Sequence, residues 1–591
     1  MKKLQSAGGQ MRKEGSGNRL IRGPFIRMLF VNMFVLMSMS ICGFVDSLVI
    51  SRRLGPDALA AVGFFLPLAM GVGMLNMVVI GSQILIGNYI GAGKKDKIDT
   101  LFISSFLVLG CFYTLIALPG IFFRNSIASL LGAGGNVHRL LGNYMLGYLP
   151  GIPLQALTAL LMAFVSFNND MRRSYISAGV MSAGNLLGDL LLAGAGTLGI
   201  GLATTLSYAA GFLILLPGYL KKEKTVHFVR TAPDLRLVGE AALRGFPVLM
   251  LTIGLVVKNA LMNRAVSGAC GDPGIAVVNV LISVCDIVGI FTGGCTTAYS
   301  TLACIFYGEQ DRRSFRGLFR TAARIGIGGC VIILIVILSA SSVLTGLFFR
   351  PDFPARNTAR DMFLLGFTFL PLNFLMNLLL STYQAQGKMN LVNILSVAET
   401  AAVGLFAFFF VPVFGINAAW LGNAAVDFVC LGVILVSVWI WKGCICFHTD
   451  ALLKLPENFG ASPDECWECT LRSMDSICDT SESAVSFCLK KGISRRTASF
   501  AGLCIEEMTR NIFQHGGHQE KDIYVDVRMV ARDRLTIRIR DNCIAFDPRK
   551  RLDQFEPEEP GRNIGIRLTA SIARQIDYYN NAGVNTLIMK L

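Results

Sequence analysis

The segment IEEMTRNIFQHGG (505–517) contains the residue pattern with the most direct chemical meaning. Glu507 and Asn511 are four residues apart, so they lie on one face if the segment is a helix. The Asn511 side chain offers a carbonyl oxygen, a ligand that Mg²⁺ accepts when it bridges phosphate groups. The Glu507 carboxylate can orient or deprotonate a water molecule or a hydroxyl group. The spacing therefore predicts a magnesium and nucleotide site with Glu507 as its catalytic residue.

Three features downstream would complete such a site. Asp541 directly follows a predicted strand in IRIRDNCIAFDP (537–548), where its carboxylate can accept from an adenine amino group. Gly561 and Gly565 lead into a predicted helix in GRNIGIRLTASIA (561–573), and a helix N-terminus favours bound phosphate. Thr586 begins the last strand, NTLIMK (585–590). We expect these residues to bind Mg-ATP together.

A second set of candidates lies inside long apolar runs. Asp46 falls in the first run, Asn185 lies one turn before Asp189 in the fifth, and Thr204 in the sixth could add a hydroxyl. Ionisable residues inside a membrane span are costly, so they are functional candidates by default. A buried carboxylate beside polar partners can alternate between protonated and ionised forms, as a proton- or sodium-coupled exporter requires. The alternative role is a hydrogen bond between helices.

The second half of the apolar region carries its own charges. Lys258 lies in the seventh run, and Asp286 in the eighth could neutralise it. Glu399 and Asp427 are two more acids that we expect to be buried. For both, hydrogen bonding between helices is the simpler role.

Hydropathy predicts the elements that position these residues. Apolar residues make up 53% of the chain and charged residues only 16%, whereas soluble domains carry about 25% charged residues. The mean hydropathy is +0.55. A helix that crosses the hydrocarbon core needs about 20 apolar residues. The chain therefore predicts an all-α polytopic membrane domain of about twelve helices: 28–50, 59–82, 100–123, 142–165, 174–196, 198–219, 245–267, 275–300, 322–348, 361–384, 391–413 and 415–441.

Basic residues give the expected orientation. The formal net charge is +15, and Lys and Arg cluster in alternate short loops, as the positive-inside rule expects. An even number of spans brings both termini to the cytoplasmic side of the cell (plasma or inner) membrane. The basic segment 1–27 is expected to be a cytoplasmic N-terminal segment and not a signal peptide. With no nucleic-acid-reading motif, the expected partners are the lipid bilayer and a small-molecule substrate, with no nucleic acid.

The apolar region divides into two similar halves, 28–220 and 245–441, joined by a basic cytoplasmic loop at 221–244. GNYIGAGKKDK (87–97) resembles IFYGEQDRR (305–313), and GIGLATTLSYAAG (199–211) resembles GINAAWLGNAA (415–425). Duplicated halves suggest a transporter with its site between them. A linker (442–460) then leads to a charged α+β domain (461–591), with helices near 469–490, 495–515 and 563–575 and strands at 521–528, 534–540 and 584–591.

Residues 20–441 resemble the multidrug and toxic compound extrusion (MATE) family. The resemblance is carried by VDSLVISRRLGPDALAAVGF (45–64), GSQILIGNYIGAGKKDK (81–97), FNNDMRRS (167–174), NLLGD (185–189) and GIGLAT (199–204). It implies two pseudo-symmetric six-helix bundles around a V-shaped cavity, and export of small cationic or amphipathic compounds by H⁺ or Na⁺ antiport. By this resemblance, the cation site of the first lobe would consist of Asp46, Asn185, Asp189 and Thr204. The acid that one branch of the family has in helix 7 is absent after Pro247, so coupling is expected in the first lobe.

Residues 465–591 resemble the GHKL ATPase superfamily, of the small anti-sigma-factor serine kinase type, through the box formed by Glu507, Asn511 and His515. The resemblance implies a Bergerat-type α+β sandwich that binds Mg-ATP, with Asn511 on the magnesium. Two departures matter: Cys543 replaces a usual glycine, and the phosphate loop has few glycines. ATP transfer to a protein serine, ATP binding alone, and a degenerate module that binds a cytoplasmic protein therefore remain open.

Three functions stay open from the sequence. The first is a secondary-active exporter controlled by its nucleotide-binding domain. The second is a transporter-like membrane sensor that controls a serine/threonine kinase or anti-sigma-type module. The third is a flippase for lipid-linked precursors, for which Lys258 is a mild indication because lipid pyrophosphates are anionic. The 16 cysteines are expected to be reduced thiols that act as small hydrophobic residues.

Overall fold

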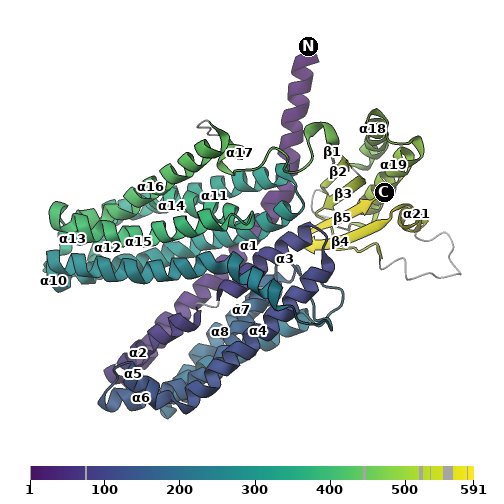
Figure 1. The fold of residues 1–591 in the computed structure, drawn as a ribbon. Helices are drawn as coiled ribbons and strands as arrows, with labels where there is room; N and C mark the ends of the chain where they lie inside the picture. Colours follow the sequence, from purple (N-terminus) through teal and green to yellow (C-terminus); the bar gives the residue numbers. More distant parts are fainter. Residues whose placement is uncertain are drawn as a thin grey trace.

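The computed structural model describes residues 2–73, 76–443, 448–517, 523–532, 534–549, 564–581 and 583–591. It consists of a large helical part and a small α+β domain at one end (Figure 1). The predicted fold class, a polytopic helical membrane domain followed by an α+β sandwich, is therefore confirmed.

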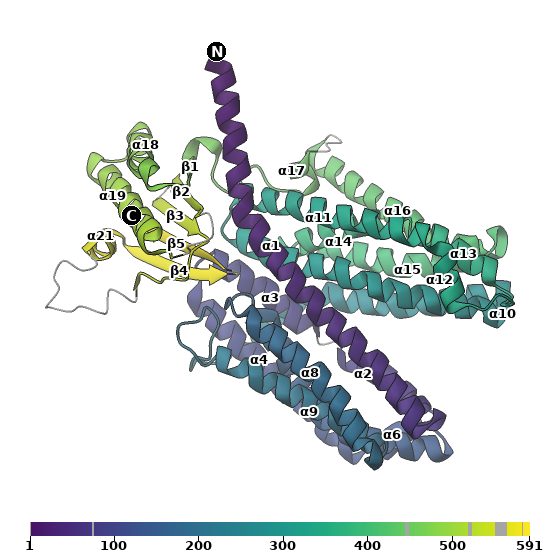
Figure 2. The same cartoon turned by 180° about the vertical axis from the view of Figure 1, so that it is seen from behind.

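The first helical lobe follows a long N-terminal helix, α1 (Lys2–Val49), which continues as a short π-helical turn, Ile50–Leu54. Figure 2 shows α1 as one long rod that passes the sheet and runs on beside α8 and α2. The lobe contains α2 (Pro56–Gly73), α3 (Asn76–Gly91), α4 (Lys95–Phe122), α5 (Arg124–Leu130), α6 (Gly135–Tyr148), α7 (Ile152–Phe164), α8 (Met171–Leu192) and α9 (Thr197–Leu215). Short 3-10 turns at Leu149–Gly151, Ala193–Ala195 and Leu216–Gly218 adjoin α7 and α9.

The second lobe begins with α10 (Leu235–Gly308), which a non-helical Gly271 divides into two membrane-spanning halves. It continues with α11 (Arg312–Ser339), α12 (Ser341–Phe348), α13 (Arg356–Leu365), α14 (Leu370–Ala385), α15 (Met389–Phe414) and α16 (Asn417–Lys442). Since α10 begins at Leu235, capped by the Asp234 side chain, the connection between the lobes is shorter than the predicted loop 221–244.

Among the described residues, ten helices are long and apolar enough to cross a membrane, and eleven if the bent pair α13 and α14 is one span. These match eleven of the twelve predicted spans. The remaining one, 59–82, falls on α2 and α3, which are separated by residues outside the described part of the chain.

The two lobes meet at the end that carries the α+β domain and diverge away from it (Figure 1). At this junction α3 packs along both halves of α10. Two glycines allow the close approach: a Cβ on Gly81 would lie 1.7 Å from the Ala241 carbonyl oxygen, and one on Gly308 would lie 2.2 Å from the Asn88 carbonyl oxygen. Any larger residue would therefore push these helices apart.

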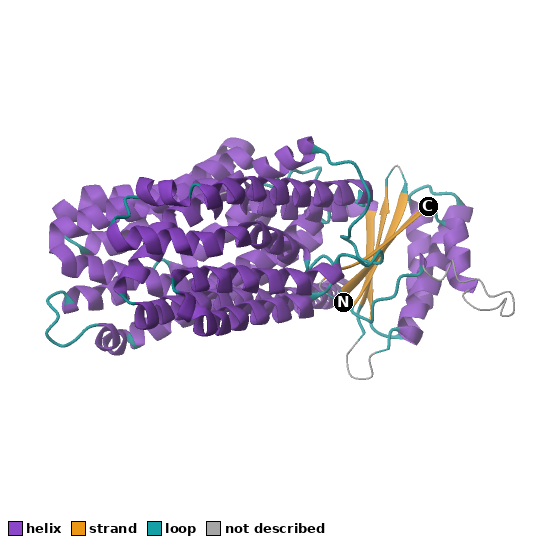
Figure 3. Ribbon diagram, turned by 90° about the horizontal axis from the view of Figure 1, so that it is seen from below, coloured by secondary structure: helices purple, strands orange, loops and turns teal. Residues whose placement is uncertain are grey.

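The C-terminal domain is a five-stranded antiparallel sheet of order β1-β2-β3-β5-β4. Its strands are β1 (Cys466–Leu471), β2 (Val525–Ala531), β3 (Leu535–Asp541), β4 (Gln575–Asn581) and β5 (Val584–Lys590). The helices α18 (Ile477–Lys490), α19 (Arg495–His515) and α21 (Ile564–Ile572) pack on one face (Figure 3). Two strands differ from the expectation, since neither β4 nor β1 was predicted. The last residues of β1, 469–471, fall where a helix was predicted, because pairing with β2 overrides local propensity.

The linker is more ordered than a plain connection. It contains a one-turn helix, α17 (Thr449–Leu452), and buries Leu453, Leu455 and Phe459. Phe459 stacks on Tyr307 at the end of α10, with ring centroids 5.0 Å apart. The linker therefore holds the α+β domain close to the second lobe.

Candidate functional site

A polar cluster in the first lobe joins α1 to α8. The Asn185 amide donates to Asp46 Oδ1 at 2.6 Å and lies 3.4 Å from Asp189 Oδ2. Asn185 and Asp189 are almost fully buried, and Asp189 Oδ1 has no hydrogen-bond partner among the residues the structure describes. The predicted trio Asp46, Asn185 and Asp189 is thus brought together, with one oxygen left free to accept a proton or a cation.

The hydroxyl that completes this cluster is not the predicted one. Thr204 donates to the Ile200 carbonyl oxygen of its own helix at 3.2 Å and makes no hydrogen bond to the acids. Ser207, three residues further along α9, is buried and lies 3.4 Å from Asn185 Oδ1. The i,i+3 spacing of Thr204 and Ser207 on one helix face was the sequence signal available for Ser207.

The second lobe contains a larger polar cluster, built on α14, α15 and α16. The Asn373 amide donates to Glu399 Oε1 at 2.9 Å and to Asp427 Oδ1 at 3.4 Å, and Asn377 donates to the same Glu399 oxygen at 3.0 Å. The second oxygens of Glu399 and Asp427 are buried without a partner in the described part of the chain. The simple role predicted for these acids, hydrogen bonding between helices, accounts for only one oxygen of each.

Lys258 extends the same cluster. Its ammonium group donates to Asn423 Oδ1 at 3.1 Å, one turn from Asp427 on α16. Gly404 of α15 permits this approach, since a Cβ there would lie 2.7 Å from Lys258 Cα. Asp286 does not neutralise Lys258 as predicted: it lies in the other half of α10, beyond the break at Gly271, and is exposed.

In the C-terminal domain, α19 presents Glu507, Asn511 and His515 along one side, all at least partly exposed. A Cβ on Gly565 would lie 2.1 Å from Glu507 Oε2, so Glu507 rests against the first turn of α21 only because residue 565 is glycine. The Asn511 side chain makes no hydrogen bond within the described residues. The Glu507 carboxylate and the free Asn511 amide therefore lie one turn apart on α19, and the carboxylate also lies against α21.

Asp541 ends β3 in a fixed position. Its Oδ1 accepts from the Cys543 backbone NH at 2.9 Å and from the Asn585 amide at 2.7 Å. Burial raises the pKa of Asp541 from its usual value, although both hydrogen bonds oppose the shift. Asn585, which also donates to the Cys543 and Ile544 carbonyl oxygens at 3.2 Å, was not predicted.

The structure corrects one nucleotide-site residue. Thr586 pairs with Arg540 across β3 and β5, while its neighbour Asn585 pairs with Asp541. Side chains alternate between the two faces of a strand, so Thr586 lies on the face opposite Asp541. Gly561 lies outside the described residues. Cys543 is buried against Gly516 at the end of α19, and burial raises the pKa of its thiol to about 12.

The described residues fit a magnesium–nucleotide ligand. Asn511 has a free amide oxygen for the metal and Asp541 is a fixed acceptor for a base amino group, whereas the space beside Gly565 on α21 is taken by the Glu507 carboxylate. When bound, Mg-ATP would supply a phosphoryl group for transfer or hydrolysis. Glu507 would orient the attacking hydroxyl, and the buried Asp541 would hold the base in register.

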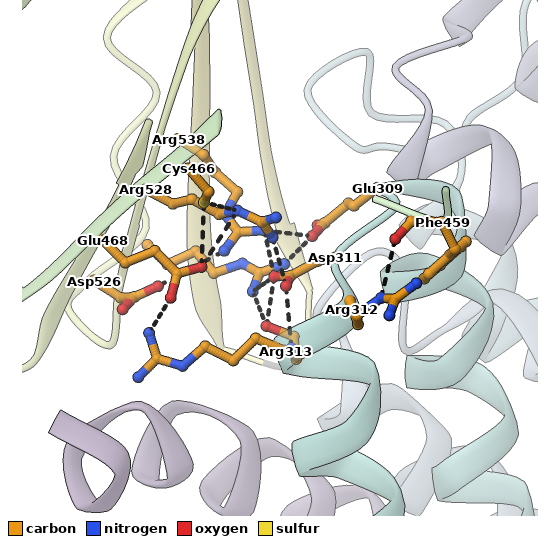
Figure 4. A network of polar contacts seen from close by, with 12 residues as sticks. Glu309, Asp311, Arg312, Arg313, Phe459, Cys466, Glu468, Asp526, Arg528 and Arg538 are labelled. Atoms are coloured by element: carbon orange, nitrogen blue, oxygen red, sulfur yellow. Dashed lines mark hydrogen bonds and ion pairs between the residues drawn. The ribbon is translucent and has the colours of Figure 1, made fainter. Parts of the chain in front are cut away.

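The other face of the sheet contacts the membrane part through a network of buried charges (Figure 4). Asp311, in the turn between α10 and α11, lies 2.5 Å from Arg528 and 2.6 Å from Arg538. Glu309 pairs with Arg538 at 3.0 Å, and also contacts Arg540 and the Tyr579 hydroxyl. Both acids are buried.

The attraction between these arginines and the Asp311 carboxylate outweighs the free-energy cost of burying that carboxylate. Burial alone would raise the pKa of Asp311, but Arg528, Arg538 and Arg540 hold it well below its usual value. Asp311 therefore stays ionised. The period-two spacing of Arg538 and Arg540 on β3 was the sequence signal for a charged sheet face.

Comparison with known proteins gives two family matches. The MatE family model matches residues 32–191 and 247–409, which is more than half of the chain. The model of the histidine kinase-like ATPase domain matches residues 475–591.

Individual relatives agree with the first match. The chain is 25% identical over 320 residues to the probable multidrug resistance protein YoeA of Bacillus subtilis, covering 50% of this chain and 67% of YoeA. It is 23% identical over 413 residues to the multidrug export protein MepA of Staphylococcus aureus, covering 67% of this chain and 88% of MepA. A MOP superfamily transporter from Pyrococcus furiosus has the same fold, with a TM-score of 0.65 at 20% identity over 74% of this chain and 99% of that one.

Proposed function

Since the chain belongs to the MatE family of multidrug efflux transporters and ends in a histidine kinase-like ATPase domain, we propose that it exports small cationic or amphipathic compounds by H⁺ or Na⁺ antiport. The ATPase domain controls this transport. The observation that supports the coupling mechanism most directly is the cluster of the half-buried Asp46 with the buried Asn185 and Asp189, which leaves one Asp189 carboxylate oxygen free among the described residues.

The cluster suits an ion that binds and leaves once per cycle. Two carboxylates share one amide donor, so a proton or Na⁺ offsets their mutual repulsion and its loss restores it. Asp46 lies on α1 and Asn185 and Asp189 lie on α8, so a change in this repulsion acts on the packing of two helices. Ion binding can in this way favour one arrangement of the lobe over another.

The ATPase domain supports the expected orientation in the membrane. Nucleoside triphosphates are cytoplasmic, so the end of the lobes that carries the sheet faces the cytoplasm, together with both chain termini. The sheet contacts the α10–α11 turn of the second lobe, and the α3–α4 turn of the first lobe is close enough that a Cβ on Gly93 would lie 3.4 Å from Asp577 Oδ2. A domain that touches both lobes at this end resists their separation there, which supports a regulatory role.

The test is ion-driven uptake of a lipophilic cation dye into proteoliposomes that contain the purified full chain. Asp46→Asn should lower the ion-dependent rate by roughly tenfold or more, because the residue no longer exchanges charge. Asp57→Asn, an exposed acid at the start of α2, is the matched control and should transport normally. An ion-driven rate in Asp46→Asn equal to that of the unmodified chain would remove the first lobe as the coupling site. A loss of ion-driven uptake in Glu399→Gln but not in Asp46→Asn would assign coupling to the second lobe.

A membrane sensor that controls a kinase is the second candidate, favoured by one observation. The face with Glu507, Asn511 and His515 is the helical face, which points away from the membrane part (Figure 3). A cytoplasmic protein could reach it while the domain stays attached. Phosphorylation of a partner that Glu507→Ala abolishes, with dye transport unchanged, would favour this function over regulated export.

A further inference from the structure

A cavity of about 640 Å³ lies between α1, α11 and the outer face of the sheet. The α1 wall is apolar and consists of Leu20, Ile21 and Pro24. The α11 wall is strongly basic, with five arginines and no acid, whereas the sheet wall has three arginines and two acids. The cavity is therefore amphipathic, with an apolar side on one membrane helix and a cationic side on another.

Its charge is unbalanced toward the positive. Eight arginines line the cavity against four acidic side chains. Six of these arginines already have ion-pair partners, which leaves Arg320 and Arg324. Both are exposed, and neither forms an ion pair or a hydrogen bond with the residues that the structure describes.

The position of the two arginines on α11 points to lipid. Arg320, Arg324, Val331 and Ile335 share one helix face, and Val331 and Ile335 are 40% and 57% exposed. Exposed apolar side chains in the middle of a membrane span contact acyl chains. If the last ~20 of the 28 residues of α11 fill the hydrocarbon core, Arg320 lies at its boundary and Arg324 about one turn inside. An arginine in that place extends toward the headgroups, where lipid phosphates are its natural counter-ions.

We propose that this cavity binds the phosphate group of an anionic phospholipid through Arg320 and Arg324. The glycerol and the upper acyl chain lie against Leu20 and Ile21 of α1. The charges of Arg320 and Arg324 favour a headgroup with net negative charge over a zwitterionic one, because these two arginines would repel the ammonium group of a zwitterionic headgroup. Because β-strand residues form the remaining wall, the bound lipid touches the membrane part and the ATPase domain together.

The test uses the purified full chain and native mass spectrometry in mild detergent, with titrations of phosphatidylglycerol and phosphatidylcholine. The unmodified chain should bind phosphatidylglycerol more tightly than phosphatidylcholine. The double variant Arg320→Gln/Arg324→Gln should weaken phosphatidylglycerol binding by roughly tenfold or more, since each removes one charge next to the phosphate. Both side chains are exposed, so the variant should fold normally, which its thermal transition checks.

The matched control is Arg350→Gln/Arg360→Gln, which removes one exposed arginine that follows α12 and one exposed arginine on α13. This control should bind phosphatidylglycerol as the unmodified chain does. Equal phosphatidylglycerol binding by the Arg320/Arg324 variant and the control would overturn the proposal. Full displacement of phosphatidylglycerol by inorganic phosphate would also overturn it, and would assign the arginines to a free anion.

Discussion

Asn585 is the residue that fixes Asp541 in the candidate nucleotide site. Its amide NH₂ group donates to Asp541 and to two backbone carbonyl oxygens, while its own oxygen accepts from the Tyr578 hydroxyl at 2.7 Å. A buried carboxylate needs such donors, because an unsatisfied buried polar group costs about 1–3 kcal/mol. The residue next to it, Thr586, takes no part because it faces the membrane part.

At this scale we predict that Asn585→Ala weakens Mg-ATP binding and Thr586→Ala does not. Without Asn585, the buried Asp541 carboxylate lacks one hydrogen-bond donor, so the free energy of unfolding of the domain should fall by about 1–3 kcal/mol. Asp541 would then no longer be held in place as an acceptor for the base. Calorimetric titration of the purified full chain with Mg-ATP measures both variants. Equal affinity for the two would show that Asp541 does not need Asn585 to hold a nucleotide.

At the scale of elements, the packing of α3 along α10 joins the lobes. Gly81 and Gly308 bring backbone against backbone at two points along the contact, which leaves no room for side chains between the helices. Such a contact does not tolerate added volume.

We predict that Gly81→Ala destabilises the protein, whereas Gly63→Ala does not. The Cβ at residue 81 would overlap the Ala241 carbonyl oxygen, and overpacking costs about 1–3 kcal/mol. Gly63 also lies in a helix, but nothing lies within 4 Å of its Cβ position, so alanine there should be neutral or slightly stabilising. Thermal unfolding of both variants in detergent gives the comparison, and an unchanged melting temperature for Gly81→Ala would contradict the close-packed contact.

At the scale of the whole molecule, the charge network around Asp311 joins the ATPase domain to the membrane part. Three arginines from β2 and β3 meet two acids from a single turn, all of them buried. Arg540 also lies over the Phe306 ring, 4.8 Å from its centroid. Removal of one partner from such a network leaves uncompensated buried charge, which costs about 3–5 kcal/mol.

We predict that Asp311→Asn loosens the ATPase domain from the membrane part. Hydrogen–deuterium exchange in β2, β3 and the α10–α11 turn should rise, while the helical face of the domain keeps its protection. Asp475→Asn changes an exposed acid in the same domain that has no ion pair with the described residues; it is the control and should exchange normally. Unchanged protection in Asp311→Asn would mean that other contacts hold the domain in place.

The same network sets the pH dependence of the contact. The pKa of Asp311 is held below its usual value of 3.8, so its stabilising contribution is fully present above that value and is lost only as the pH falls below it. We therefore predict the same exchange protection of β2 and β3 between pH 8 and pH 5. A loss of protection near pH 6 would assign control of the contact to another group.

The sequence by itself determined the two-part architecture and eleven of the twelve predicted membrane spans. Apolar runs of fixed length require helices in lipid, and the i,i+4 spacings of Asn185 with Asp189 and of Glu507 with Asn511 survive into the fold because each pair lies within one helix. The sequence did not determine contacts between elements distant in the chain. Four such contacts depend on which helix faces and which strand face meet. They are Ser207 in place of Thr204 beside Asn185, Asn423 in place of Asp286 as the partner of Lys258, Asn585 in place of Thr586 beside Asp541, and the attachment of the sheet to Asp311. Those choices were decided by tertiary packing, because the free energy of a buried polar contact depends on both partners and local sequence specifies only one.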